Sequence, residues 1–194
     1  MHETKSENSN FPIRALILID WQYALSKSDP YWGGARNNPQ AEAHGLRLLT
    51  HWRAKAWPVF HIRHLSKTPG SPLRHGEAGA EFIASLAPMG GEPVIDKSVN
   101  SCFIGTALEP LLKSQNLTHL VICGLTTNHC VSTSVRMAGN LGFDVILAGE
   151  ACATFDRTGA DGTFYPAQTV HEVSLANIHG EFCEVKSTEA ILEL

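Results

Sequence analysis

Cysteine is scarce in this sequence, and its few copies are not arranged for cross-linking. The 194 residues contain five cysteines, an odd number, at wide spacings and with no CxxC pair. Disulfide frameworks and zinc ribbons use regularly spaced or closely paired cysteines, so neither is indicated. We therefore expect reduced, mostly buried thiols and a cytoplasmic protein. The cysteines are Cys102, Cys123, Cys130, Cys152 and Cys183.

Blocks of basic residues and long apolar runs are also absent. Lys and Arg number 15 against 19 Asp and Glu, a net charge of −4, whereas binding to a nucleic-acid backbone normally requires clustered basic residues. No apolar stretch approaches the ~20 residues of a membrane span. The polar segment 1–10 lacks the apolar core of a signal peptide. Neither nucleic acid nor a membrane is therefore an expected partner.

The composition that is present is typical of one globular domain. Hydrophobic residues make up 43% of the chain and charged residues 18%, a balance that excludes a disordered or low-complexity protein. A chain of this length usually forms a single domain. We expect a frayed tail at residues 1–10 and one domain over residues 11–194.

Short apolar runs alternate with helical patterns along the chain. Runs that suit buried parallel strands cover residues 14–20, 57–63, 93–97, 118–123, 143–148 and 182–185. Helical patterns cover residues 39–55, 104–115, 128–140 and 167–179. This alternation predicts an α/β fold, a three-layer αβα sandwich around a mainly parallel, Rossmann-like sheet. The Gly- and Pro-rich residues 66–91 predict an irregular excursion with one short helix near Glu81, and they are a candidate lid.

Three predicted strands end in side chains that can take part in chemistry. Asp20 closes the first run, Lys97 closes the third, and the segment from Gly124 to Cys130 follows the fourth. The carboxyl ends of parallel strands meet at one edge of the sheet, and sites form there where the strand order reverses. An acid, an amine and a thiol are therefore expected to converge.

Cys130 lies near the start of a predicted helix, with Thr127 or Asn128 as the expected N-cap. The free N–H groups and partial positive charge of a helix N-terminus favour thiolate over thiol, and they can stabilise an oxyanion. These features predict a nucleophile. The alternative is a buried helix cysteine that acts as a small hydrophobic residue.

Asp20 and Lys97 each have an ordinary alternative as well, since an Asp after a strand often caps a turn and a Lys is often a surface residue. In a shared cleft, Asp20 can take the thiol proton and later pass it to a leaving amine. Lys97 can supply fixed positive charge beside them. The three residues together, rather than any one of them, favour a catalytic site.

The motifs around these residues resemble the isochorismatase-like cysteine hydrolase superfamily, which includes nicotinamidases and N-carbamoylsarcosine amidases. The resemblance covers about residues 14–188, and its most specific part is Gly124-Leu-Thr-Thr-Asn-His-Cys-Val131 with Thr133. The other matching segments are residues 16–20 with Gln22, 59–64, 92–97, 100–103, 105–108 and 151–154.

The resemblance implies a catalytic triad of Asp20, Lys97 and Cys130 and a cis peptide bond between Leu125 and Thr126. It implies that the backbone N–H groups of Thr126 and Cys130 form an oxyanion hole, and that the protein is a homodimer or homotetramer. The implied reaction is two-step acyl transfer. Cys130 attacks an amide or carbamoyl carbon of a small-molecule substrate, an amine or ammonia leaves, and water hydrolyses the thioester.

Two departures from the family pattern narrow the function. True isochorismatases, which cleave a vinyl ether, lack the nucleophilic cysteine. Nicotinamidases typically carry a metal site of one Asp and several His after the second strand, but residues 56–64 contain no Asp, and His61 and His64 on a strand point to opposite faces. We therefore expect no metal and no other cofactor.

The prediction is a cysteine hydrolase that cleaves a C–N bond in a small amide or carbamoyl compound. The alternatives are a nicotinamidase, a non-catalytic ligand-binding relative, and a thiol redox protein with Cys102 or Cys123 as the resolving thiol. Aromatic side chains at Tyr31 and Trp32 are further candidates for an apolar substrate wall. The candidate substrate-lining residues are Trp21, Gln22, Tyr23, His64, Phe103, Thr127 and His129.

Overall fold

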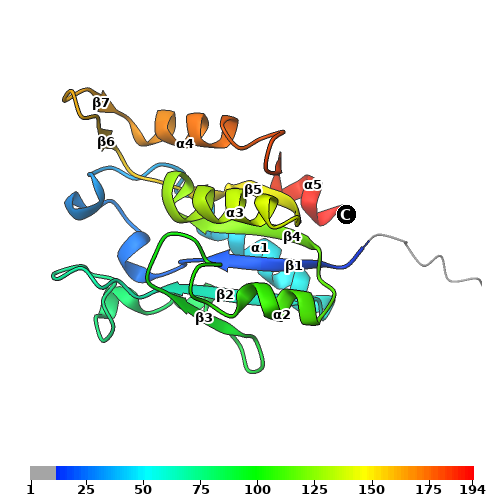
Figure 1. Cartoon of the computed structure of the whole chain (residues 1–194). Helices are drawn as coiled ribbons and strands as arrows, with labels where there is room; N and C mark the ends of the chain where they lie inside the picture. The colour runs from blue at the N-terminus through cyan, green and yellow to red at the C-terminus, as the bar shows by residue number, and fades with distance from the viewer. Residues whose placement is uncertain (1–11) are drawn as a thin grey trace, which may run out of the picture.

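Six parallel strands form the centre of the fold, in the order β3-β2-β1-β4-β5-β8 (Figure 1). The structure, a computed structural model, describes residues 12–194; the predicted tail, residues 1–10, lies outside the described residues. The predicted α/β class with a parallel sheet is confirmed. The strands are β1 Arg14–Ile19, β2 Val59–His64, β3 Val94–Lys97, β4 His119–Leu125, β5 Asp144–Ala153 and β8 Glu184–Lys186.

Helices cover both faces of the sheet, because the central strands are apolar on both sides. Ala15, Ile17 and Ile19 of β1 pack toward α2 (Leu108–Ser114) and α3 (Ser132–Asn140). Leu16 and Leu18 pack toward α1 (Ala41–Ala54) and α5 (Thr188–Leu192). Figure 1 shows α2 and α3 in front of the sheet and α1 behind it, which confirms the predicted three layers.

Several elements differ from the prediction in their bounds or their type. β5 continues to Ala153 rather than ending at residue 148. The segment around Glu81 forms two 3-10 turns, Ala78–Ala80 and Ala84–Leu86, instead of one helix. A small hairpin of β6 (Arg157–Thr158) and β7 (Phe164–Tyr165), followed by α4 (Ala167–Ala176), lies beyond β5. Elements of two or three residues are too short to show a period, so the sequence pattern does not reveal them.

Among residues 12–194, no helix combines the length and the apolar character needed to cross a membrane.

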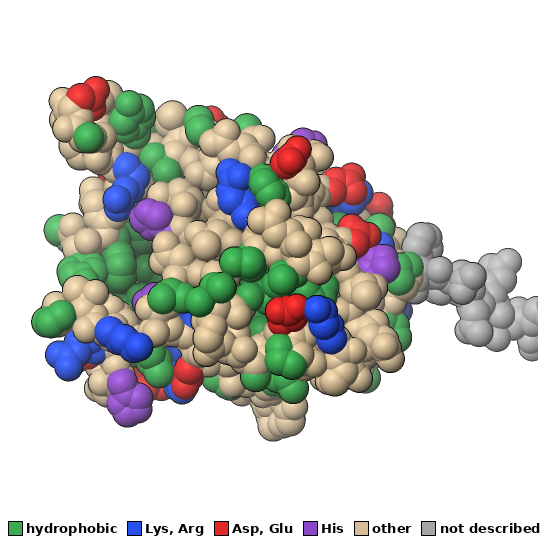
Figure 2. All heavy atoms as spheres, viewed as in Figure 1, with side chains coloured by type: hydrophobic (Ala, Val, Ile, Leu, Met, Phe, Trp, Pro, Cys, Tyr) green, Lys and Arg blue, Asp and Glu red, His purple; other side chains and the backbone are tan. Residues whose placement is uncertain are grey.

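The strand order reverses at β1, since β2 and β3 extend to one side of it and β4, β5 and β8 to the other. In parallel sheets such a reversal opens a crevice beyond the carboxyl ends of the strands. Asp20 follows β1 and Thr126 follows β4, so both lie at this crevice. Figure 2 shows the molecule hollowed on that side, at the left of the view, with hydrophobic side chains in the depth of the hollow.

Gly124 brings the end of β4 unusually close to β1. Its φ is +138°, and a Cβ at this position would lie 2.0 Å from the carbonyl oxygen of Ile19. The pairing of β4 with β5 shifts register between Ile122 and Gly124. Only glycine adopts this conformation and leaves room for the neighbouring backbone. Gly124 therefore carries the segment after β4 toward the residue that follows β1.

Gly124→Ala is expected to lower the free energy of unfolding by about 3 kcal/mol or more, because the methyl group would both strain the backbone and collide with a strand carbonyl. The matched control is Gly142→Ala. Gly142 also has a positive φ, +84°, but no atom of the described residues lies within 4 Å of its added Cβ, so only the backbone cost of roughly 1 kcal/mol is expected. Urea denaturation of both variants measures the difference, and equal losses would contradict this account.

Candidate active site

Asp20, Lys97 and Cys130 meet at the crevice. Lys97 Nζ lies 2.7 Å from Asp20 Oδ2 and 3.2 Å from Cys130 Sγ. The alternation of β3 places Lys97 on its buried side and the neighbouring Asp96 on its exposed side. His64, at the end of β2, is the third partner of the ammonium, with its Nδ1 3.0 Å from Lys97 Nζ. The predicted convergence of an acid, an amine and a thiol is therefore observed.

Asp20 has one carboxylate oxygen engaged and one free. Its φ of +52° lies in the left-handed region, where a short polar residue such as Asp is tolerated. Oδ2 accepts the hydrogen bond from Lys97, while Oδ1 is buried and has no hydrogen-bond partner among the described residues. Burying a carboxylate oxygen without a hydrogen-bond donor costs free energy. Oδ1 is therefore available to accept a proton or a hydrogen bond.

Burial, and then the Asp20 carboxylate, raise the pKa of the Cys130 thiol above its ordinary value, while Lys97 acts in the opposite direction. This direction is opposite to the sequence-based expectation that Cys130 favours the thiolate. The pKa of the Lys97 amine is also raised. Burial lowers the pKa of Lys97, but the negative charge of Asp20 and the hydrogen bonds to Asp20 and Cys130 outweigh burial and raise it. These two shifts favour a thiol at Cys130 and an ammonium at Lys97.

The segment after β4 carries Cys130 into the crevice. The Leu125–Thr126 peptide bond is cis. The helix that follows begins with a π-helical turn, Thr127–Val131, and its N-cap is Thr126 rather than Thr127 or Asn128. The Thr126 carbonyl accepts from the N–H groups of His129 and Val131. In the part of the chain that is described, the N–H of Thr126 donates no hydrogen bond to a backbone carbonyl.

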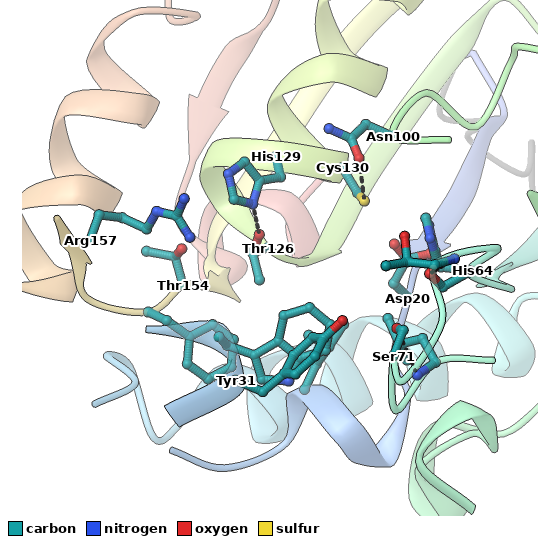
Figure 3. A pocket seen from close by; sticks show the side chains of 16 residues that line it. Asp20, Tyr31, His64, Ser71, Asn100, Thr126, His129, Cys130, Thr154 and Arg157 are labelled. Carbon is teal, nitrogen blue, oxygen red and sulfur yellow. Dashed lines mark hydrogen bonds between the residues drawn. The ribbon is translucent and has the colours of Figure 1, made fainter. Parts of the chain in front are cut away.

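A pocket of about 220 Å³ opens in front of Cys130. Tyr31, Trp32 and Phe155 form an apolar wall, and Asp20, His64 and Cys130 lie at one end (Figure 3). Thr126 and His129 also line it, as does part of the segment 66–91, through Ser66, Thr68, Ser71 and Leu73. The volume suits a small molecule rather than a peptide or a nucleic acid.

Three predicted lining residues are buried elsewhere, so these predictions are wrong. Trp21 is fully buried against α1, where a Cβ on Gly45 would lie 2.9 Å from its ring. Phe103 belongs to the core and stacks on Phe143 with ring centroids 5.8 Å apart. Thr127 is fully buried and its hydroxyl lies 2.8 Å from His171 Nδ1.

Gln22 and Tyr23 also lie outside the pocket lining. The Gln22 amide donates to the carbonyls of His64 and Ala80 and accepts from the N–H of His64, at 2.7–3.0 Å. Gln22 therefore fixes the backbone at the end of β2, and through it the position of the His64 ring. Tyr23 is 46% exposed, and its hydroxyl accepts from the N–H of Ala84.

The pocket residues that were not predicted from the sequence include Asn100, Thr154 and Arg157. The Asn100 side chain lies near the thiol, with Cys130 Sγ 3.8 Å from Asn100 Oδ1. Each of the three follows a strand of the parallel sheet within four residues, Asn100 after β3 and the others after β5. The rule that sites form beyond the carboxyl ends of strands was therefore an available signal, but the end of β5 was predicted too early.

The ligand atoms of Asp20, His64 and Cys130 lie within 4.8 Å of one another, a spacing that would suit a metal ion. The sequence did not indicate a three-ligand set around His64, because its members come from three separate strand ends. Lys97 Nζ is within hydrogen-bond distance of all three residues. An ammonium in the middle of the set repels a cation, so these residues do not fit a metal. His61 points away, with its Nε2 2.8 Å from Glu92 Oε2.

Both the sequence and the fold are similar to those of known proteins. The sequence profile of the isochorismatase domain matches residues 14–190. The isochorismatase-family protein YrdC from Bacillus subtilis is 44% identical over 92% of this chain and 94% of its own length. A crystal structure of an isochorismatase-family protein from Chromobacterium violaceum is 47% identical, covers 93% of this chain and 92% of that chain, and superposes with a TM-score of 0.88.

A more distant relative is named for the reaction that it catalyses. Nicotinamidase 3 from Arabidopsis thaliana is 26% identical over 91% of this chain and 86% of its own length.

Proposed function

The chain belongs to the isochorismatase family of hydrolases, and we propose that it is a cysteine amidohydrolase that cleaves a C–N bond in a small amide or carbamoyl compound. One observation carries this proposal. The buried Lys97 binds both the Asp20 carboxylate and the Cys130 sulfur, and Asp20 and Cys130 line one end of a small pocket. A general base, a fixed charge and a nucleophile are then in direct contact.

In the first step, the thiol proton passes from Cys130 Sγ to Asp20 as the sulfur attacks the carbonyl carbon. The free oxygen of Asp20, Oδ1, is the acceptor for this proton. Because the resting thiol has a raised pKa, proton transfer accompanies the attack instead of preceding it. The Thr126 N–H, which is unengaged by backbone carbonyls among the described residues, is a donor for the oxyanion, together with the Cys130 N–H.

The tetrahedral intermediate then breaks its C–N bond. Asp20 returns the proton to the leaving nitrogen, and ammonia or an amine departs while the acyl group stays on Cys130 as a thioester. In the second step, water attacks the thioester carbonyl and gives its proton to Asp20. Asp20 then reprotonates the sulfur, and the acid is released. Throughout both steps, Lys97 holds the carboxylate in place through a hydrogen bond.

A thiol redox function is not supported by the surroundings of the other cysteines. Cys102 and Cys123 are fully buried, and burial raises the pKa of each thiol to about 12. Neither lines the pocket in which Cys130 would form a mixed disulfide, and burial disfavours the thiolate that would resolve it. Nicotinamide hydrolysis is one specific case of the proposed reaction.

An ammonia-release screen over small primary amides, ureas and carbamates, with nicotinamide included, tests the proposal. We expect at least one of these compounds to release ammonia. We also expect the rate to survive exhaustive treatment with EDTA, because Lys97 occupies the position that a metal would need. The absence of ammonia release across the screen would contradict the amidohydrolase proposal. Loss of activity with EDTA, restored by zinc or iron, would contradict the metal-free mechanism.

A further inference from the structure

Arg157 lines the pocket at the end away from Lys97. It is the first residue of β6, four positions after β5 ends, and its side chain is exposed at the pocket mouth. Figure 3 shows its guanidinium on the opposite side of His129 and Thr126 from Asp20 and His64. The pocket therefore has a reactive end at Cys130 and a cationic end at Arg157.

No described residue neutralises the charge of Arg157. In the described part of the chain, no carboxylate lies within 4.0 Å of its guanidinium, although two aspartates are close in sequence. Asp156 accepts from the backbone N–H groups of Ala167, at 2.7 Å, and Ala35, at 3.1 Å. Asp161 accepts from the N–H and hydroxyl of Thr163. Both aspartates are engaged locally, so Arg157 keeps its full hydrogen-bonding capacity for a ligand.

The neighbouring wall adds no negative charge. His129 lies between Arg157 and Cys130, and burial, followed by the charge of Arg157, lowers its pKa. His129 is therefore neutral near neutral pH. Among residues 12–194, the pocket lining contains one carboxylate, that of Asp20, which lies at the other end and is paired with Lys97. An anionic ligand group is thus attracted at one end of the pocket only.

Building on the proposed amidohydrolase function, we infer that the substrate carries a carboxylate, which Arg157 binds while the scissile amide or carbamoyl group lies at Cys130. A guanidinium presents paired N–H donors in a plane that matches a carboxylate. Tyr31, Trp32 and Phe155 flank the space between the two ends, so an apolar spacer fits there. At the other end the charge of Asp20 is balanced by Lys97, so the carboxylate is attracted toward Arg157, and this fixes the orientation of the substrate.

The inference is tested with matched pairs of amides that differ in one charge. Succinamate, glutaramate and adipamate each carry a primary amide and a carboxylate at increasing separation, and the corresponding diamides are neutral. In the wild-type protein, we expect kcat/KM to favour one of the carboxylates over its diamide. Arg157→Gln should lower kcat/KM for that carboxylate by about 10- to 100-fold, mainly through KM, and leave the diamide unchanged. Arg157→Lys should restore part of the loss.

Lys67→Gln is the matched control, because Lys67 is exposed beside the pocket segment but does not line the pocket. It removes the same charge and should change neither substrate by more than about twofold, since an exposed charge at a distance is screened. If Arg157→Gln leaves the carboxylate-to-diamide ratio unchanged while amides are still hydrolysed, the inference about Arg157 is overturned and the amidohydrolase proposal stands.

If the protein hydrolyses neither the carboxylates nor the diamides, that result counts against the amidohydrolase proposal instead. Calorimetric binding of glutaramate and glutaramide to the Cys130→Ala protein then decides the role of Arg157 independently of turnover. Tighter binding of glutaramate that disappears when Arg157→Gln is added supports the inference. Equal binding of the two compounds, or binding that Arg157→Gln does not change, overturns it.

Discussion

Cys130→Ala is expected to abolish amide turnover, with kcat falling by about 10⁴-fold or more, while substrate binding is retained. The substitution removes the nucleophile, and without it the thioester cannot form. Binding should survive because the pocket walls, Tyr31, Trp32 and Arg157 among them, are unchanged. Ammonia release and binding calorimetry on the same preparation measure the two effects separately.

The other cysteines provide matched controls for this experiment. They are buried free thiols away from the pocket lining, so their replacement by alanine should preserve turnover and lower stability by roughly 1 kcal/mol each. Substantial turnover in Cys130→Ala would rule out covalent catalysis and point to direct attack by water. The control substitutions are Cys102→Ala, Cys123→Ala, Cys152→Ala and Cys183→Ala.

Asp20→Asn is expected to lower kcat by about 10³-fold or more and yet to accelerate alkylation of Cys130 by iodoacetamide. Turnover falls because an amide cannot accept the thiol proton or return it to the leaving nitrogen. Alkylation depends on the thiolate, and the Asp20 carboxylate raises the pKa of Cys130. Removing that negative charge while Lys97 stays lowers the pKa of the thiol, so more thiolate is present at neutral pH.

The pH profile of alkylation follows from the same shift. In the wild-type protein, alkylation should be slow near neutrality and should rise with pH, because the pKa of Cys130 lies above its ordinary value. The profile of Asp20→Asn should move to lower pH. Asp96→Asn is the control, since Asp96 is exposed on the same strand as Lys97 and pairs with Arg63; it should change neither turnover nor alkylation. Slower alkylation in Asp20→Asn would contradict the assigned roles.

A double variant of Asp20 and Cys130 completes this test. Because the proton transfer depends on the thiol, Asp20→Asn should add little to the loss already caused by Cys130→Ala. Losses that multiply would mean that Asp20 acts independently of Cys130. Thermal melts of all three variants check that the proteins remain folded, since Lys97 is buried and depends on Asp20 as its partner.

The sequence by itself determined the fold class and the convergence of Asp20, Lys97 and Cys130 at one edge of the sheet. Apolar runs such as residues 14–19 are buried on both faces, and only a parallel sheet between two helical layers satisfies that pattern. The ends of these strands can be located in the sequence because a charged residue, Asp20 or Lys97, ends the apolar run. Parallel strands bring such residues to one edge, which is why residues 77 positions apart in the chain could be expected to meet.

Only the tertiary structure decided the electrostatic state of the site and the walls of the pocket. The helix start at Cys130 favours a thiolate locally, but burial and the Asp20 carboxylate raise the pKa of the thiol, and both come from other parts of the chain. Trp21 follows Asp20 directly, yet it packs into α1, because neighbouring side chains at a strand end point in different directions. No sequence pattern around Arg157 distinguishes it from a surface arginine. Its place in the pocket lining depends on where the β6–β7 hairpin lies relative to Cys130.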